Sequence, residues 1–341
     1  MDDRMPADAS ANEAFDPNKD YEEIVYSDAW KTQRPAAYSE YREMWDRVPR
    51  TKQELDFPIH VDIETSTYCN LACPMCSRTI MVDNGELEPN LVMTRKEYAS
   101  IIDQAAAMGS KSIKLGYNNE PLTHKDIVWQ VEYAKQKGII DVLINTNATV
   151  MTKAKSEALL KAGIDGMFVS FDAASPDLFA KQRVGASIGR VTDNLYEFVK
   201  LRNELRPGCQ IRLSMVMYDD PVWQGEFASL QTMWKRLVDA VGYTNFLEFK
   251  TDEKKQYAEV PGWWCSQPFQ RIVLKLSGKA SLCCPDVRDE LAVGDWRTTS
   301  LADLWRGERA REIRRMHADG KYHSLDACAR CDFPHLEKKC K

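Results

Sequence analysis

Apolar and β-branched residues alternate between short and long segments along the middle of the chain. Six short runs are rich in strand-forming residues, and longer segments between them repeat apolar residues at helical spacing. Thr94 and Glu97 have the spacing of a helical capping box. We expect strands at 59–64, 112–117, 141–145, 166–171, 210–217 and 246–250, and helices at 94–108, 125–136, 153–162, 188–205 and 227–240.

This alternation predicts parallel strands joined by helical crossovers, and therefore the α/β class. Six such units are typical of a partial barrel or of a doubly wound sheet. Both folds place ligand chemistry at the carboxyl ends of the strands. Polar residues that follow these strands are therefore the candidates for a binding site.

The segments on either side of the repeat differ from it. Residues 1–57 are charged and aromatic, with Pro6, Pro17 and Pro35 breaking any long helix, and they show no clean strand pattern, so we interpret them as an extension packed on the core. We assign residues 58–255 to the barrel and residues 256–341 to a separate, small, cysteine-rich α+β module. In that module we expect short strands at 271–276 and 279–282 and one helix at 301–316.

Charge and hydropathy exclude two classes of function. The 46 Lys and Arg residues nearly balance the 51 Asp and Glu residues, which excludes a protein that acts mainly by coating nucleic acid. No stretch approaches the roughly 18 apolar residues of a membrane helix, and the chain begins with an acidic segment that lacks an apolar run. We expect a cytoplasmic protein with no membrane or nucleic-acid partner.

The ten cysteines are the part of the composition that points to chemistry. In a reducing compartment they indicate metal binding or catalysis rather than disulfides. Cys69, Cys73 and Cys76 directly follow the first expected strand, with no fourth cysteine nearby. Three thiolates on one loop leave an open coordination position at which a metal can bind a substrate. A zinc site completed by a distant residue is the alternative.

The CxxxCxxC spacing, with an aromatic residue before it and a β/α run after it, resembles the radical S-adenosylmethionine (radical SAM) enzymes over residues 57–250. The resemblance implies a partial (β/α)6 TIM-like barrel whose three cysteines hold a 4Fe-4S cluster. The open iron of that cluster binds S-adenosylmethionine, and reductive cleavage gives a 5′-deoxyadenosyl radical. A flavodoxin- or ferredoxin-type electron donor is implied as a partner.

Further polar residues match the family pattern at successive strand ends. Glu120 and Pro121 stand where relatives carry a GGEPL-like motif, with two asparagines in place of the glycines, and Arg183 suits the cofactor carboxylate because its guanidinium forms paired hydrogen bonds. Turn formation, helix capping and surface charge are the alternative roles. The resemblance assigns cofactor binding to Tyr68, as a lid, and to Glu120, Asn145, Asn147, Ser170, Asp172 and Arg183.

A second cysteine cluster lies near the end of the chain. Two separated cysteines bracket a short hairpin with Gly278 at its turn, and a CxxC follows about 45 residues later. The arrangement resembles the SPASM and twitch modules of radical SAM enzymes, but it holds too few cysteines for two complete clusters. We expect one auxiliary 4Fe-4S cluster, with zinc in the same site as the alternative. Its ligands are then Cys265, Cys283, Cys328 and Cys331.

Three cysteines remain outside these sites. Cys284 is interpreted as a packed thiol or as a catalytic hydrogen donor, Cys209 as a structural residue and Cys340 as a spare thiol. An electron-accepting auxiliary cluster favours an oxidoreductase that dehydrogenates a small polyhydroxylated substrate, namely a sugar, aminosugar or aminocyclitol. A redox-neutral epimerase and a maturase of ribosomally made peptides are alternatives, and a non-catalytic electron carrier fits least. Candidate substrate contacts, which could equally be surface or packing residues, are Arg78, Glu86, Tyr117, His124 and Lys250.

Overall fold

One ten-stranded sheet runs through the described part of the chain, which in this computed structural model comprises residues 22–247 and 256–335. The strands are β1 (Glu22–Val25), β2 (His60–Ile63), β3 (Ser112–Leu115), β4 (Asp141–Thr146), β5 (Gly166–Ser170), β6 (Gln210–Met217), β7 (Ala240–Asn245), β8 (Arg271–Leu274), β9 (Lys279–Ser281) and β10 (Ala292–Asp295). Their order in the sheet is β1-β7-β6-β5-β4-β3-β2-β8-β9-β10.

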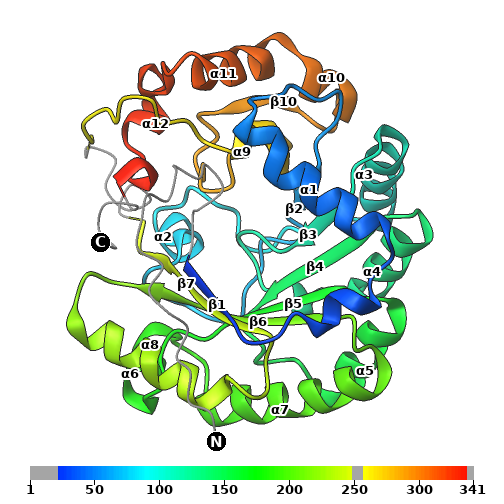
Figure 1. The fold of residues 1–341 in the computed structure, drawn as a ribbon, viewed down its shortest axis with the longest axis vertical. Coiled ribbons are helices and arrows are strands. Elements are labelled where there is room, and N and C mark those ends of the chain that lie inside the picture. The colour runs from blue at the N-terminus through cyan, green and yellow to red at the C-terminus, as the bar shows by residue number, and fades with distance from the viewer. Residues whose placement is uncertain (1–21, 248–255, 336–341) are drawn as a thin grey trace, which may run out of the picture.

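The six strands β2 to β7 are parallel neighbours and form the partial barrel predicted from the sequence. Figure 1 shows the barrel helices as an outer ring around these strands. The ring includes α3 (Arg95–Met108), α4 (Ile127–Gln136), α5 (Lys153–Ala162), α6 (Pro176–Gln182), α7 (Ile188–Leu205) and α8 (Pro221–Trp234), while the short α2 (Ser77–Asp83) follows the first cysteine cluster.

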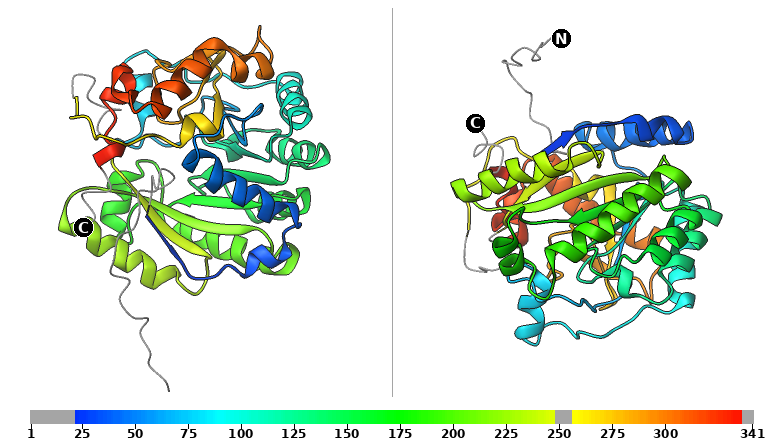
Figure 2. Two further views of the ribbon diagram at one scale, coloured as in Figure 1. Left: turned by 45° about the horizontal axis from the view of Figure 1, so that its top comes forward. Right: turned by 90° about the horizontal axis from the view of Figure 1, so that it is seen from below.

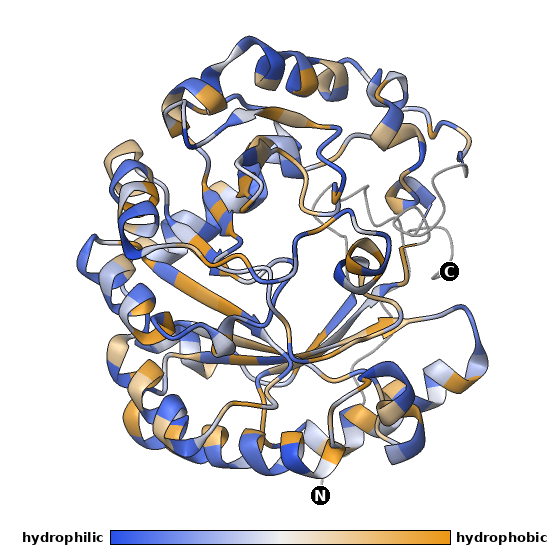
Figure 3. Ribbon diagram, turned by 180° about the vertical axis from the view of Figure 1, so that it is seen from behind, coloured by the Kyte–Doolittle hydropathy of each residue, from blue (hydrophilic) through white to orange (hydrophobic). Residues whose placement is uncertain are grey.

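Side-chain alternation along the strands separates a packed face from an open face. In β6 the residues Ile211, Leu213, Met215 and Met217 are buried, and the residues between them are half-buried. Successive side chains of a strand point to opposite faces, so the buried set belongs to the core shared with the helices and the other set faces the barrel lumen. Figure 3 shows the central strands as largely hydrophobic and the surrounding helices as mixed.

Most of the predicted barrel elements are present where the sequence places them. The observed bounds of α5 and α7 equal the predicted ones, and Thr94 and Glu97 form the capping box at the start of α3. The sixth barrel strand is β7, which begins six residues before the predicted strand at 246–250; residues 246 and 247 are not in a strand, and 248–250 lie outside the described residues. α8 ends at Trp234 rather than at residue 240. Gly242 explains the miss, because a Cβ there would lie 2.5 Å from a carbonyl oxygen of β1, and a glycine gives no strand signal.

Residues 22–57 contain more regular structure than their sequence pattern suggests. The missed strand β1 pairs antiparallel with β7, and the missed helix α1 (Ala37–Arg50) follows Pro35 and the short 3-10 helix η1 (Ala29–Gln33). Arg34 forms ion pairs with Asp141 at 3.0 Å and Asp165 at 2.8 Å, which lie near the amino-terminal ends of β4 and β5. The segment therefore covers the end of the barrel opposite the cysteine loop, and Figure 2 shows α1 and α2 on opposite sides.

The C-terminal module continues the barrel sheet. β8 pairs in parallel with β2, and β9 and β10 add antiparallel strands, with the predicted turn glycine Gly278 at φ +92°. The expected helix at 301–316 is two helices, divided at Gly307, where a Cβ would lie 2.8 Å from the Asp303 carbonyl oxygen. The module's helices are α9 (Gln267–Gln270), α10 (Leu301–Arg306), α11 (Glu308–Ala318) and α12 (Asp326–Ala329), with 3-10 helix η4 (Tyr322–Ser324).

Candidate functional site

The first cysteine cluster lies on the loop between β2 and α2, at the carboxyl end of the barrel. The Cys76 amide donates to the Cys73 carbonyl oxygen at 3.1 Å, and α2 begins at the next residue. The loop is fastened to the segment after α6, because the Ala72 amide donates to the carbonyl oxygen of Val184 at 3.0 Å. All three thiols therefore project from one fixed loop, which suits one face of an iron–sulfur cluster.

Arg78 stabilises the start of this loop through a hydrogen bond to its backbone. Its side chain is buried, and Nε donates to the Thr67 carbonyl oxygen at 2.7 Å. Thr67 in turn donates its hydroxyl to the Glu88 carbonyl oxygen at 2.6 Å. This arrangement gives Arg78 a bracing position rather than the substrate-facing position considered for it.

Glu120 is the centre of a hydrogen-bond network that connects three strand ends. Its buried carboxylate accepts from the Thr146 hydroxyl at 2.6 Å, from the Asn147 amide at 2.7 Å and from the Leu122 amide at 3.0 Å, while its own amide donates to the Tyr68 carbonyl oxygen at 2.9 Å. Burial raises the pKa of this carboxyl, and these donors counteract the rise. Glu120 thus aligns the loops after β2, β3 and β4.

The network continues from Asn147 to the cysteine loop. The Asn147 amide group donates to the Asn70 side-chain oxygen at 3.1 Å and lies 3.9 Å from Cys69 Sγ. Asn70 donates to the Thr149 hydroxyl at 2.8 Å, and that hydroxyl donates to the Asn147 side-chain oxygen at 2.6 Å. Of the two asparagines predicted at this strand end, Asn147 is held beside the cysteines, whereas Asn145 is exposed on the lumen face of β4.

Half-buried Arg183 forms an ion pair with buried Asp172 beside the same loop. Arg183 Nη1 lies 3.8 Å from Cys73 Sγ, and Asp172 Oδ1 accepts from the Val216 amide at 2.7 Å. Burial raises the pKa of the Cys73 thiol to about 11, although the guanidinium opposes this. The structure therefore places a cation beside the cysteine loop, and Ser170 lies half-buried at the end of β5.

The other residues predicted to contact the cofactor or the substrate have separate environments. The Tyr68 side chain is 43% exposed. Exposed Glu86 forms an ion pair with Arg288 at 3.4 Å, and buried His124 contacts the Met93 carbonyl oxygen at 3.3 Å, so both have local roles. Lys250 lies outside the described residues.

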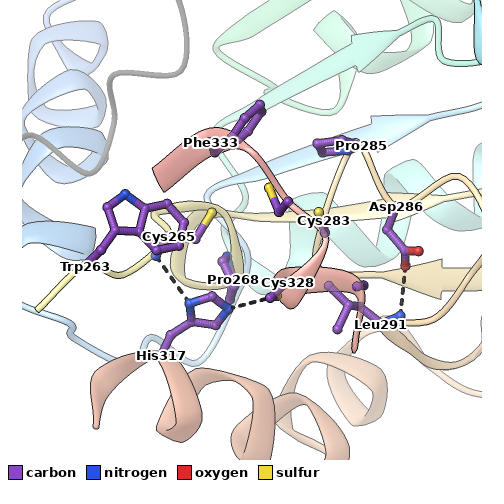
Figure 4. Close-up of a pocket in the computed structure, with 12 residues that line it drawn as sticks. Trp263, Cys265, Pro268, Cys283, Pro285, Asp286, Leu291, His317, Cys328 and Phe333 are labelled. Atoms are coloured by element: carbon purple, nitrogen blue, oxygen red, sulfur yellow. Dashed lines mark hydrogen bonds between the residues drawn. The ribbon is translucent and has the colours of Figure 1, made fainter. Parts of the chain in front are cut away.

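The second cysteine cluster surrounds one cavity in the C-terminal module. The four predicted ligands come from three segments: Cys265 precedes α9, Cys283 follows β9, and Cys328 and Cys331 lie in and after α12. Figure 4 shows cysteine side chains from these segments around a common space. The remaining lining is largely apolar or aromatic and includes Trp263, Pro268, Pro285, Leu291, Ala327 and Phe333.

The four cavity cysteines suit either a cubane cluster or zinc, because both take thiolate ligands. Among the described residues, no three His, Cys, Asp or Glu side chains already converge as they would on one metal ion. Burial raises the pKa of the Cys283, Cys328 and Cys331 thiols, so metal binding must displace their protons.

His317 is a cavity residue that the sequence interpretation missed. It projects from α11, is 1% exposed, and places Nε2 3.7 Å from Cys328 Sγ, while Nδ1 lies 3.3 Å from the Cys265 amide nitrogen. Burial lowers the pKa of the imidazole to about 4. A sequence signal exists, because Ala310, Ile313 and His317 share the buried face of α11 at helical spacing.

Asp286 organises the turn that follows Cys283. Its carboxylate accepts from the Ser281 hydroxyl at 2.8 Å and from the amides of Glu290 at 3.0 Å and Leu291 at 2.9 Å. Its carbonyl oxygen accepts from the Tyr117 hydroxyl at 3.2 Å. Tyr117 follows β3 at the mouth of the barrel, so this hydrogen bond connects the end of β3 to the turn after Cys283.

The three remaining cysteines have separate environments. Cys284 is half-buried, donates its amide to Gln267 Oε1 at 2.8 Å, and is not one of the described residues that line the auxiliary cavity. Cys209 is fully buried in the core before β6, as its structural interpretation predicts. Cys340 lies outside the described residues.

Sequence comparisons assign both cysteine-bearing regions to known domains. A model of the Radical SAM superfamily matches residues 63–209, which contain the loop, the Glu120 network and the Arg183–Asp172 pair. The chain therefore contains a radical SAM domain. A model of the SPASM iron–sulfur cluster-binding domain matches residues 265–332 and contains the four auxiliary cysteines. These domains imply 4Fe-4S clusters and S-adenosylmethionine as cofactors.

Curated relatives share only part of their length with this chain. GTP 3′,8-cyclase of Limosilactobacillus fermentum is 30% identical over 139 residues, which are 40% of this chain and 40% of the relative. PqqA peptide cyclase of Bradyrhizobium diazoefficiens is 27% identical over 135 residues, which are 40% of this chain and 34% of the relative. The chain therefore spans less than half the length of these relatives.

Solved structures show the same fold at low sequence identity. BtrN in complex with AdoMet and 2-DOIA has a TM-score of 0.54 at 16% identity, with 82% of this chain and 94% of that chain covered. The value for anSMEcpe with bound AdoMet is 0.59 at 13% identity, with 81% and 90% covered. Streptococcus suis SuiB bound to its precursor peptide SuiA gives 0.57 at 15% identity, with 82% and 72% covered. Within the described ranges, no helix combines the length and apolar character needed to cross a bilayer.

Proposed function

We propose that the chain is a radical SAM dehydrogenase that oxidises an alcohol of a small polyhydroxylated molecule, namely a sugar, aminosugar or aminocyclitol. The observation that carries the proposal is a cavity lined by four cysteines, which the Tyr117–Asp286 hydrogen bond joins to the barrel mouth. Removing two electrons from an alcohol requires an acceptor after the first hydrogen atom has been abstracted. A fully ligated cluster next to the barrel mouth suits that role.

When bound, the first cluster and S-adenosylmethionine supply the 5′-deoxyadenosyl radical that abstracts hydrogen from the substrate. Cys69, Cys73 and Cys76 are the proposed ligands of this cluster, and Cys265, Cys283, Cys328 and Cys331 those of the auxiliary cluster. The other side chains hold and orient the cofactor. Its proposed contacts are Tyr68, Glu120, Asn145, Asn147, Ser170, Asp172 and Arg183.

Arg183 is the best-supported of these cofactor contacts. Its guanidinium is held in place by Asp172 and lies next to Cys73, where a carboxylate bound to the open iron would arrive. Paired hydrogen bonds from a planar guanidinium fit a carboxylate. Asn145 and Ser170 present polar groups from the lumen faces of neighbouring strands, in position to contact the cofactor or the substrate.

The comparison with BtrN supports a small substrate. The alignment covers most of both chains, and the BtrN structure contains 2-DOIA beside AdoMet. SuiB with its precursor peptide and PqqA peptide cyclase support the alternative, a peptide maturase. Against that alternative, β1 joins the barrel sheet and Arg34 forms ion pairs with barrel residues. Residues 22–57 therefore belong to the barrel scaffold and do not form a separate peptide-binding domain.

A redox-neutral epimerase is the second alternative, since it needs a thiol that returns hydrogen to the substrate. Cys284 is the candidate donor, and its side chain is near enough to Tyr117 to influence that phenol electrostatically. Its position outside the auxiliary cavity lining leaves it free from ligation. We favour dehydrogenation, because the four cavity cysteines provide an electron acceptor.

We propose a flavodoxin- or ferredoxin-type protein as the reductant. Exposed apolar side chains border the cysteine loop: Tyr68 lies on it, Leu91 accepts a hydrogen bond from Thr67, and Val184 accepts one from Ala72. An exposed apolar patch next to a redox centre is suited to docking a redox partner. Such a reductant is consistent with a cytoplasmic location.

The test is anaerobic incubation of the reconstituted chain with S-adenosylmethionine, a reductant and separate panels of aminocyclitols, aminosugars, sugar nucleotides and precursor peptides. We expect a member of the small-molecule panels to increase 5′-deoxyadenosine release. When that substrate carries deuterium at the attacked carbon, the deuterium should appear in the 5′-deoxyadenosine. The chain with Cys69, Cys73 and Cys76 replaced by alanine is the control. Stimulation by peptides alone would contradict the small-substrate proposal.

A further inference from the structure

His317 occupies a defined place between the auxiliary cysteines and two aromatic rings. Its ring is 1% exposed, stacks on Tyr322 at 6.1 Å between centroids with 17° between the planes, and meets Trp263 edge-on at 6.3 Å. In this position the two ring nitrogens face Cys265 and Cys328. Figure 4 shows both nitrogens engaged in this way.

The two contacts determine where the imidazole carries its proton. The Cys265 main-chain amide can only donate, so Nδ1 must accept its hydrogen bond through a lone pair. A neutral imidazole has one N–H group, which must then be at Nε2. Nε2 lies 3.7 Å from Cys328 Sγ, within hydrogen-bond distance for sulfur. The backbone therefore fixes the tautomer that directs an N–H group toward a ligand sulfur.

A histidine with a purely structural role would not need both of these hydrogen bonds. Packing between Trp263 and Tyr322 would be satisfied by another flat apolar ring, and it would not need a hydrogen bond on each nitrogen. Hydrogen bonds to ligand sulfurs are one of the factors that set the reduction potential of an iron–sulfur cluster. The donor stabilises the reduced cluster more than the oxidised cluster, because reduction adds negative charge to the sulfurs.

We propose that His317 is a positioning residue of the auxiliary site that donates an N–H···S hydrogen bond to the Cys328 thiolate and raises the reduction potential of the auxiliary cluster. The inference rests on the four-cysteine cluster of the proposed function, but not on the substrate or on the reaction outcome. The hydrogen bond would favour transfer of an electron from the barrel site to the auxiliary cluster.

The test compares three variants of the full chain after anaerobic reconstitution. His317→Met removes the donor and keeps much of the side-chain volume, whereas His317→Gln keeps an N–H donor. His323→Gln is the matched control, because His323 lies in the same module and contacts the Tyr257 carbonyl oxygen at 2.7 Å instead of a cysteine. The auxiliary-cluster potential is measured by redox titration followed by electron paramagnetic resonance. Added S-adenosylmethionine identifies the signal of the first cluster.

We expect the auxiliary-cluster potential to become more negative in His317→Met and to recover toward the wild-type value in His317→Gln. It should not change in His323→Gln, and the potential of the first cluster should not change in any variant. An unchanged auxiliary potential in His317→Met with four auxiliary irons present would overturn the proposal. Because no substrate is used, this result is independent of the dehydrogenase assignment.

If His317→Met does not retain the cluster, the wild-type protein provides the test. Reduced enzyme labelled with ¹⁵N-histidine should show magnetic coupling between the auxiliary cluster and an imidazole nitrogen. In heavy water, an exchangeable deuteron should couple to the same cluster. Absence of both couplings would refute the hydrogen bond.

Discussion

The Tyr117 hydroxyl donates a hydrogen bond to the Asp286 carbonyl oxygen at 3.2 Å, and this contact joins the end of β3 to the turn that carries Cys283. Lys275 donates to the same carbonyl oxygen and forms an ion pair with Asp289. The turn is therefore held from the barrel side and from β8 together. In the proposed function, this places the auxiliary cluster at a fixed position relative to the barrel mouth.

The first prediction tests that connection through Tyr117→Phe, which removes the hydroxyl and keeps the ring. A neutral hydrogen bond contributes about 1 kcal/mol, so local opening of residues 283–291 should become roughly five times more frequent. Hydrogen–deuterium exchange of the loaded chain measures this opening. Tyr133→Phe is the control, because Tyr133 donates at 2.9 Å to the surface residue Asp103. Equal exchange in both variants would show that Tyr117 does not hold the turn.

The second prediction concerns iron content. Reconstituted chain should contain about eight iron and eight sulfide if it holds two cubanes, and alanine at Cys69, Cys73 and Cys76 should remove about half of each. Alanine at Cys265 and Cys283 should remove the other half, because two thiolates do not hold a cubane. Analysis of iron, sulfide and zinc distinguishes the cases. About four iron and one zinc per chain would refute the auxiliary cluster and leave the first cluster in place.

The third prediction concerns Arg183. Arg183→Lys keeps the charge beside Asp172 but loses the planar pair of donors, so S-adenosylmethionine should bind roughly tenfold to a hundredfold more weakly. Asp172→Asn should also weaken binding, because it releases the guanidinium from its buried partner. Calorimetry on the loaded protein measures both affinities, with the exposed neighbour Lys181→Ala as the control. Unchanged affinity in both Arg183→Lys and Arg183→Ala would exclude a cofactor contact.

The sequence predicts the site better where chemistry depends on local spacing than where it depends on distant contacts. The loop from Cys69 to Cys76 and the strand-end residue Glu120 are recognisable because a cluster and a parallel sheet require them at fixed places along the chain. The partners of Glu120 are less evident. Thr146 contributes a hydroxyl, and Asn147 contributes its main-chain amide. Every residue except proline has a main-chain amide, so the residue type does not reveal this contact.

The elements that the sequence missed depend on pairing between remote segments. β1 is stabilised as a strand by its contact with β7, and β7 passes through Gly242, which gives no strand signal. The pairing of β8 with β2 likewise joins segments about 200 residues apart, so the cysteine-rich module looks separate in the sequence although its sheet continues the barrel. His317 was missed for the same reason, because Cys265 and Cys328 reach it only through the fold.

The fourth prediction concerns the pH dependence of stability through Glu64. Burial raises the pKa of this carboxyl from 4.5 to about 7, although the Leu276 amide and Lys275 lower it. Between these values the folded chain keeps a proton that the unfolded chain has released. Protonated Glu64 therefore stabilises the folded state, and the full contribution, roughly 3 kcal/mol, is present below about pH 4.5. This contribution is lost as the pH rises to about 7.

The measurement compares melting temperatures of wild-type chain and Glu64→Gln at a fixed scan rate from pH 5 to pH 8. The wild-type chain should lose stability relative to the variant as the pH rises, because the variant has no carboxyl to ionise. Exposed Glu132 provides the control, since Glu132→Gln changes a side chain that is solvated in both the folded and unfolded states. A melting difference for Glu64→Gln that does not vary with pH would contradict the assignment.

The fifth prediction distinguishes dehydrogenation from epimerisation through Cys284→Ala, which leaves all seven proposed cluster ligands in place. If the auxiliary cluster accepts the second electron, the variant should keep much of its activity and form one oxidised product for each 5′-deoxyadenosine. If the Cys284 thiol returns hydrogen, the variant should still cleave S-adenosylmethionine but should form almost no epimer. Mass spectrometry of a single reaction gives the ratio of substrate-derived product to 5′-deoxyadenosine.

Heavy water provides an independent version of the same test. A thiol proton exchanges rapidly with solvent, so an epimerase would place solvent deuterium at the inverted carbon. A dehydrogenase returns no hydrogen to the attacked carbon and should incorporate none there. Because the four cavity cysteines provide an electron acceptor, we expect an oxidised product without deuterium. A product in which one solvent deuterium has replaced the abstracted hydrogen would instead establish hydrogen return. Loss of that product in Cys284→Ala would identify the donor.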